Sequence, residues 1–479
     1  MKTFAALLVF VASVAVACGA LAQQPASAFF ESARTSLSMN DLARLQPAAG
    51  TAMRPLTVTQ SVDNLRNYLA TADASATIPT MGNAASKAAG DKLQRVLSDT
   101  SLQSAQLVSF DLRMIETPSI ADTRFKLCEG AEPYCSVVRS RRRETLAGGV
   151  QRMLTTIGGV EGKPHGQAIF IRDEGDVHGI LNVAQRTYVL RPLANGVFVI
   201  TSAKTGELER SKDDVLDLKP QPAPAKPSSG TSNDSVKIAD DSCPNPATVQ
   251  VLEVLAMWTQ KASKEALATG HSVRQLVRTA EAVANFSFRN SNINGEVRAK
   301  PIGAAKYAET GDMYTDVQEL LKEGGRTQDV RNARRREKAD VAVLIVDHPD
   351  STNCGIAAGI SVPKDKAYAV VNWKCITDKF SFIHEIGHLA GAWHDPRALG
   401  SGYNVQPPYA HGYVTGGNEP MATIMAYRES CAKPCGRGWF WSNPHTKNEE
   451  GQVLGTPDKS FDACVWRQRL PVMVNFDGG

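Results

Sequence analysis

The sequence predicts two folded units: an α/β domain with a mixed, twisted sheet in its second half and a β-rich unit before it. Between residues 106 and 202, short segments rich in β-branched residues alternate with Gly and Asp turns, as antiparallel strands do. After residue 243, strand and helix patterns alternate along the chain. Residues 219–242 separate the units, because a segment rich in Pro, Ser and Gly cannot bury a core.

The first residues predict a secretory signal peptide. Lys2 supplies the positive charge, Phe4 to Ala17 form the apolar segment, and Ala20-Leu21-Ala22 fits the rule for cleavage after a small residue. We therefore expect a protein secreted to the periplasm or the extracellular space, where disulfides form. Lipid attachment at Cys18 is the alternative. No later segment is apolar enough to predict a membrane span.

The N-terminal unit carries no cluster of catalytic residues. Residues 23–105 are rich in Ala and Ser, with helical patches such as Ser61 to Thr71. His165 and His178 lack the spacing of metal ligands, so we expect them at the surface. The basic cluster from Arg139 to Arg143 is expected in a solvated turn or a processing site. Strands are expected at 107–116, 167–173, 177–183, 186–193 and 196–202.

The α/β unit opens with an apolar strand, Val249 to Trp258. A helix follows from Ser272, a suitable N-cap, because the next apolar residues recur on one helical face. The short, Gly-broken segment from Cys354 to Val362 is typical of an edge strand. Further strands are expected at Gly295–Ile302, Ala339–Val346 and Ala367–Trp373, and a helix from about Lys379.

Composition limits the classes of function. The chain has 479 residues, of which 42% are hydrophobic and 21% charged, so it can form sizeable cores. Its net charge of +4 is small. A dedicated nucleic-acid-binding protein would concentrate basic residues on one face, so nucleic acid is not an expected partner.

Nine cysteines are present, and eight remain after the signal peptide. Two fall in the N-terminal unit and six in the α/β unit, so each unit can form its own disulfides. Spacing alone does not fix the pairing. We predict Cys354–Cys375, Cys431–Cys435, a Cys243–Cys464 bond joining the two ends of the α/β unit, and Cys128–Cys135.

The most informative motif is HEIGHLAGAWHD, residues 384–395. His384 and His388 are four residues apart, so a helix aims both at one point. Glu385 is placed to take a proton from a metal-bound water and pass it to a leaving amine. Gly391 permits the sharp turn that brings His394 round as the third ligand. Three histidines with the fourth position open to water are the arrangement of a catalytic Zn²⁺, one per domain.

This stretch resembles the metzincin signature HExxHxxGxxH, which is followed by a Met-turn. Met425, in TIMAY, corresponds to the Met-turn methionine, which in that family lies under the zinc as an apolar floor. In some members a Tyr two positions later binds the metal or steadies the transition state, and Tyr427 stands there. Asp395 resembles a structural Asp of the reprolysin branch.

The resemblance runs from Ala247 to Phe476 and is nearest to bacterial reprolysin-like, peptidyl-Asp metalloendopeptidases. It implies a secreted zinc endopeptidase that cleaves on the N-terminal side of Asp. The sequence after Tyr427 and the C-terminal DACVWRQRLP depart from that subfamily, so a broad-specificity protease is one alternative. A non-catalytic binding protein is the other, although it would not need Glu385. Further matching segments are YAETGDMYTDVQELL, CGIA, HGY and WSNP.

The resemblance also implies a substrate and a maturation route. A protein or peptide substrate would bind as an extended strand along Gly355 to Ile360, to a protein expected to be a monomer. Arg428 is the candidate partner for a substrate Asp, although a solvent-facing position is expected for it. Cys243 is either a disulfide cysteine or a thiolate that closes the zinc site. The expected segments are 1–22 signal, 23–218 propeptide, 219–242 linker with Asp234, Asp240 and Asp241 as self-processing sites, and 243–479 peptidase. A permanent adhesion domain is the alternative to the propeptide.

Overall fold

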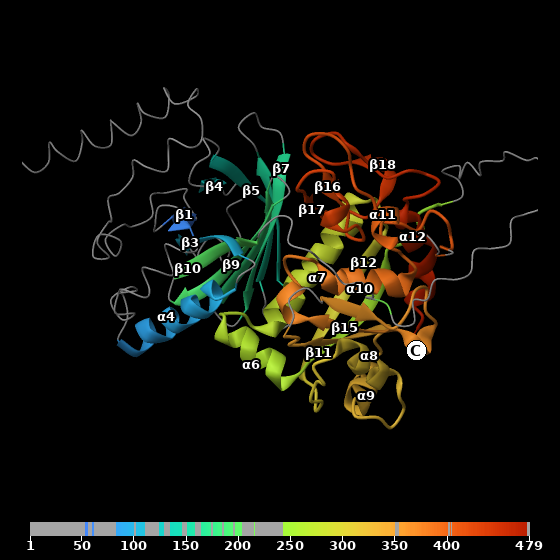
Figure 1. The fold of residues 1–479 in the computed structure, drawn as a ribbon, viewed down its shortest axis with the longest axis horizontal. Coiled ribbons are helices and arrows are strands. Elements are labelled where there is room, and N and C mark those ends of the chain that lie inside the picture. The colour runs from blue at the N-terminus through green and yellow to red at the C-terminus, as the bar shows by residue number, and fades with distance from the viewer. Residues whose placement is uncertain are drawn as a thin grey trace, which may run out of the picture.

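The structure is a computed structural model of the whole chain. It describes residues 243–476 apart from 350–353, 401–402 and 404, and in the first half the elements named below, residues 98–99 and Val215. The expected signal peptide, the expected linker and the helical patch after Ser61 lie outside the described residues. Figure 1 shows the two units, with helix α7 of the second packed against strand β7 of the first.

The N-terminal unit is an antiparallel sheet of ten strands, flanked by helix α4 (Asn83–Leu97). Leu93 and Val96 of this helix form a small core with Leu193 and Val199 of the sheet. The predicted antiparallel β unit is therefore confirmed. The strands are β1 (Met53–Pro55), β2 (Gln60–Ser61), β3 (Leu102–Phe110), β4 (Arg124–Cys128), β5 (Cys135–Thr145), β6 (Gln151–Gly158), β7 (Pro164–Asp173), β8 (Asp176–Val183), β9 (Arg186–Ala194) and β10 (Val197–Ala203).

The basic cluster was predicted in a solvated turn or a processing site, and the predicted turn is wrong. Residues 139–143 lie in the middle of strand β5, which pairs with β4 on one side and β6 on the other. The backbone ladder on both sides fixes this segment as a strand, whatever the charge of its side chains.

The second unit contains the predicted mixed sheet, in the order β12-β11-β13-β15-β14. Its first four strands are parallel, and β14 runs antiparallel at the edge, with Gly355 opposite Val371 and Ala357 opposite Ala369. Each predicted strand of this unit is present. They are β11 (Gln250–Trp258), β12 (Gly295–Ala304), β13 (Val341–Val346), β14 (Gly355–Ala357) and β15 (Tyr368–Asn372).

Helix α7 (Val273–Asn290) begins after Ser272, as predicted, with a capping box to Gln275. The chain also forms helices that hydrophobic periodicity did not reveal, among them α9, which is almost entirely polar. The other helices are α6 (Gln260–Ala268), α8 (Met313–Leu321), α9 (Gln328–Arg336), α10 (Ser381–Ala390), α11 (Pro396–Leu399) and α12 (Asp462–Met473). Short elements are η4 (Lys364–Lys366), η5 (Trp373–Cys375), η6 (Arg428–Ser430), β16 (Met421–Ala422), β17 (Gly436–Arg437), β18 (Asn443–Lys447) and β19 (Val453–Leu454).

The two units share one buried interface. Ile169, Ile171 and Ile180 of the N-terminal sheet belong to the same apolar core as the second unit. Polar contacts cross the interface as well. Gln275 donates to the Asp173 carbonyl (3.1 Å), Asn182 donates to the Arg437 carbonyl (2.9 Å), and the Gln167 and Asn290 amides pair with each other.

Three predicted disulfides are present: Cys243–Cys464, Cys354–Cys375 and Cys431–Cys435. Cys128 and Cys135 lie opposite each other in the β4–β5 ladder, and their side chains fall outside the description. The bond from Cys243 overturns the alternative in which this thiolate closes the zinc site. Among the described residues, no helix is both long and apolar enough to cross a bilayer.

Candidate active site

Helix α10 carries the histidine motif and is buried along its whole length. Its apolar residues Ile383, Ile386 and Leu389 belong to the main core, which fixes the helix against the sheet. The helix ends at Gly391, whose φ of 121° falls in a region that favours glycine. The Gly391 N–H bonds back to the Gly387 and His388 carbonyls, and the chain then reverses toward His394.

This turn brings the three predicted histidines together. One ring nitrogen from each of His384, His388 and His394 lies within 4.8 Å of the others, and all three rings are buried. The Nε2 of His394 lies 3.3 Å from Nε2 of His384 and 3.1 Å from Nε2 of His388. Two tetrahedral zinc ligands at about 2.05 Å from the ion would stand about 3.3 Å apart, so the spacing fits zinc.

The hydrogen bonds of the Nδ1 atoms fix the tautomer that presents the Nε2 atoms of two histidines to a cation. The Nδ1 of His384 lies 2.9 Å from the Ile424 carbonyl oxygen, and that of His388 lies 2.8 Å from the Ala392 carbonyl oxygen. A carbonyl only accepts, so each Nδ1 carries the hydrogen and each Nε2 keeps its lone pair. Lone pairs that converge this closely repel each other unless a cation lies between them. The residues present therefore fit the metal.

Glu385 lies directly against the edge strand. A Cβ added to Gly355 of β14 would stand 2.3 Å from the Glu385 Oε1 and 2.7 Å from its Cδ. Glycine at this position therefore lets the carboxylate reach the sheet edge beside the histidines. The carboxylate is 1% exposed, so its charge lies in a poorly solvated environment.

Met425 and Tyr427 approach the histidines from the following loop. A Cβ at Gly387 would lie 2.9 Å from the Met425 sulfur, so this methionine packs under helix α10. The Tyr427 ring centroid lies 4.4 Å from that of His394 and 6.3 Å from that of His384. Asp395 joins the two segments, because its carboxylate accepts from the Tyr427 N–H (3.0 Å) and caps helix α11.

Two further residues fix these loops. Arg437 donates from Nε and Nη2 to the Ala426 carbonyl, and from Nη1 to the Lys379 carbonyl. His411 lies with its Nδ1 2.7 Å from the His394 carbonyl oxygen, and burial lowers its pKa. Arg428 is half-buried in η6 rather than solvent-facing. No sequence motif pointed to Arg437, because its partners are backbone carbonyls of distant segments.

The edge strand already has a neighbour from the first half of the chain. Val215 is 3% exposed and forms a parallel β-bridge with Ala357 of β14. The sequence did not predict this contact, since Val215 precedes the expected linker and is 142 positions from its partner. The bridge places Val215, near the end of the N-terminal unit, against β14, the strand that also contacts Glu385.

Comparison with known proteins identifies the family of this chain. Residues 248–437 match the profile of metallo-peptidase family M12. A peptidyl-Asp metalloendopeptidase of Xanthomonas campestris pv. campestris is 32% identical over 382 residues, which cover 76% of this chain and 83% of that protein. Another of that name, from Stenotrophomonas maltophilia (strain K279a), is 31% identical over 291 residues, covering 59% of this chain and 64% of that protein. The resemblance found from the sequence is confirmed.

Proposed function

The chain belongs to metallo-peptidase family M12 and hydrolyses peptide bonds, and from this premise we propose that His384, His388 and His394 hold one catalytic Zn²⁺. The observation that carries the proposal is the convergence of three Nε2 atoms, two of which have Nδ1 fixed on a backbone carbonyl. When bound, the ion would polarise the scissile carbonyl and acidify a water in the fourth position.

We propose Glu385 as the general base that takes a proton from the attacking water and delivers it to the leaving amine. Its position supports this role, because Glu385 is on the helix that carries His384 and His388, and its carboxylate lies against Gly355 of the edge strand. Tyr427 is the proposed hydrogen-bond donor to the oxygen that becomes negative as water adds. Met425, packed under helix α10 at Gly387, is proposed as the Met-turn residue.

The substrate is proposed to bind as an extended strand on β14. This strand is the edge of the sheet, so its outer backbone groups can pair with a peptide. A peptide paired there passes Gly355, and therefore passes the Glu385 carboxylate. The bridge between Val215 and Ala357 supports this, since the protein already pairs a strand residue with this edge.

For specificity, we propose cleavage on the N-terminal side of Asp. The support is the name of the similar proteins, peptidyl-Asp metalloendopeptidase. Arg428, half-buried directly after Tyr427, is the proposed partner of the substrate carboxylate. A broad-specificity protease is the alternative, and a cleavage profile on a peptide library separates the two.

The decisive experiment substitutes the base. Glu385→Ala should retain one zinc per chain and the fold, and lose turnover by about a thousandfold or more, because only the proton transfer is removed. Zinc is measured by elemental analysis and turnover by hydrolysis of casein. Wild-type turnover in Glu385→Ala would disprove the mechanism. Bound zinc with no turnover in the wild type would instead support a non-catalytic binding protein.

We further propose that the chain is a secreted zymogen, with residues 1–22 as signal, 23–218 as propeptide, 219–242 as linker and 243–479 as peptidase. Val215 supports latency, because it pairs with Ala357 of β14, the strand with which a substrate would pair. N-terminal sequencing of wild-type and Glu385→Ala precursors tests self-processing before Asp234, Asp240 or Asp241. A mature N-terminus formed equally by both would show that another protease cuts the linker.

A further inference from the structure

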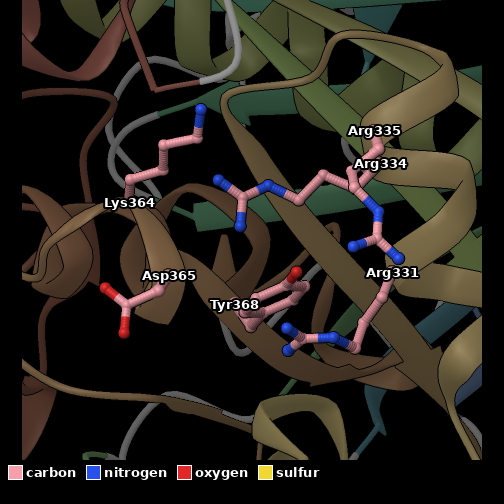
Figure 2. Close-up of a pocket in the computed structure, with 6 residues that line it drawn as sticks. All are labelled: Arg331, Arg334, Arg335, Lys364, Asp365 and Tyr368. Atoms are coloured by element: carbon pink, nitrogen blue, oxygen red, sulfur yellow. The ribbon is translucent and has the colours of Figure 1, made fainter. Parts of the chain in front are cut away.

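A basic pocket of about 370 Å³ lies at the start of strand β15. Figure 2 shows the six side chains that line it. Four of the six side chains that line it are cationic and one is anionic, which gives a formal excess of three positive charges. They are Arg331, Arg334 and Arg335 of α9, Lys364 and Asp365 of η4, and Tyr368 of β15. None of these residues belongs to the proposed zinc site.

The pocket is built from fixed side chains. Arg334 is 3% exposed and donates to the carbonyls of Ala339 (3.1 Å) and Asp340 (2.6 Å). The guanidinium carbons of Arg334 and Arg331 stand 4.7 Å and 5.4 Å from the Tyr368 ring centroid. Two buried guanidinium groups are thus held on one aromatic ring before any ligand arrives.

Arg331 points to a missing acceptor. It is 9% exposed, and its Nη1 donates to the Leu320 carbonyl (2.9 Å). Its carboxylate neighbour, Glu323, is 3.5 Å away and 79% exposed, so this ion pair is weak. Among the described residues, the buried Nε of Arg331 has no hydrogen-bond partner. The pocket therefore offers an excess of positive charge to an anion, and the unpaired Arg331 Nε lies buried at its wall.

The position of the pocket relative to β14 indicates what kind of anion it meets. The Ala358 N–H donates to the Tyr368 carbonyl (3.0 Å), which ties the end of the edge strand to the pocket. Along β15, Tyr368 lies three residues before Val371, which pairs with Gly355 beside Glu385. The pocket is therefore about 10 Å along the sheet from the proposed base. It lies on the opposite face of the sheet, because side chains three positions apart on a strand point to opposite faces.

We propose that the basic pocket binds the carboxylate of an acidic residue, Asp or Glu, in a peptide strand paired with β14, about three residues from the bond that is cut. This rests on the proposed function, because it requires the substrate on β14. Guanidinium groups suit the ligand, since they bind carboxylates through paired, charge-assisted hydrogen bonds. The chain contains such a peptide: Val215, which pairs with β14, has Asp213, Asp214 and Asp217 within two residues.

The test uses the active protein obtained from the full chain, with peptides that contain one cleavable bond. Glu or Gln is placed at each position two to four residues from that bond, on either side, and mass spectrometry identifies the bond cut. We expect Glu to lower KM about tenfold relative to Gln at one position, with kcat unchanged. The double variant Arg335→Gln/Lys364→Gln should give the same KM for the Glu and Gln peptides. Arg336→Gln, exposed on the same helix but outside the pocket, should keep it.

Two outcomes overturn the proposal: equal KM for Glu and Gln at all positions in the wild type, or a ratio that survives the double variant. If no peptide is hydrolysed, the proposed function fails on its own. The pocket is then judged by fluorescence anisotropy of the labelled Glu and Gln peptides. Tighter binding of Glu that the double variant removes supports the pocket, and equal affinities overturn it.

Discussion

Two groups of buried histidines in this chain are built in opposite ways. His384, His388 and His394 come from eleven consecutive residues, and their Nε2 atoms converge. His178 and His271 come from different units, with Nδ1 of one 3.2 Å from Nδ1 of the other. In the first group, His384 and His388 hold their ring hydrogens on backbone carbonyls, which leaves their Nε2 lone pairs for a cation. In the second group the two rings hydrogen-bond to each other, and His271 also accepts from Arg191. Adding a proton to this pair would disrupt these contacts.

The hydrogen positions of the second group follow from Arg191. This guanidinium can only donate, and its Nε lies 2.5 Å from the His271 Nε2, which must accept. His271 then carries its hydrogen on Nδ1 and donates it to Nδ1 of His178. Both rings are therefore neutral, and protonating His271 at Nε2 would place an N–H against the Arg191 N–H.

The largest expected effect comes from breaking the first group. His388→Ala should lose the metal and lower turnover by about a thousandfold or more, because two nitrogens do not complete a catalytic zinc site. His178→Asn should keep one zinc per chain. Elemental analysis of both variants is the measurement, with thermal unfolding to verify that each is folded. A full zinc complement in His388→Ala would contradict the assignment.

The second prediction is that acid weakens the contact between the units. Burial, then the charges of Arg191 and Lys92, lower the pKa of His178 from 6.5 to about 3, and burial also lowers the pKa of His271. Asp99 and Asp378 are the acidic groups that act on Arg191. The folded state keeps both rings neutral, whereas the unfolded state binds protons as the pH falls below about 6.5. The stability that the neutral pair contributes is therefore complete above about pH 6.5 and is lost on acidification.

At pH 4.5 the loss for His178 is about 3 kcal/mol, which is roughly a hundredfold in the unfolding equilibrium. The measurement is urea unfolding of the Glu385→Ala precursor, which does not cleave itself, at pH 7.5 and 4.5. His178→Asn is the control, because an amide oxygen can accept from His271 but does not titrate between these pH values. The His178→Asn precursor should lose clearly less free energy of unfolding between pH 7.5 and 4.5. An equal loss in both precursors would contradict a role for His178.

A third, smaller effect tests the position of Glu385. Gly355→Ala adds a Cβ where the Glu385 carboxylate now lies, so the carboxylate must move while the three histidines keep their places. We expect kcat to fall about tenfold and zinc content to stay at one, because only proton transfer is disturbed. Unchanged kcat would show that Glu385 has room that the structure does not indicate.

The same contrast explains what the sequence could predict. The convergence of the zinc histidines follows from local rules, namely the four-residue spacing on a helix and the turn at Gly391, and the edge strand follows from its short Gly-broken pattern. His178 was predicted at the surface, and this was wrong, since it is 4% exposed. Its partner His271 is 93 positions away, and no local pattern encodes a contact between units. The Val215 bridge and the basic pocket escaped prediction for the same reason.

The smallest expected effect sharpens the acid response. Lys92 of α4 is half-buried, and its charge helps to lower the pKa of His178. Lys92→Ala should raise that pKa slightly, because the Lys92 charge acts on His178 more weakly than burial and Arg191 do. A smaller shift from 6.5 means a smaller stability loss on acidification, so the pH at which the units separate should fall slightly. Lys433→Ala removes the same charge from an exposed position and should leave it unchanged. If the pH at which the units separate moved toward neutral in Lys92→Ala, Lys92 would act through packing rather than through its charge.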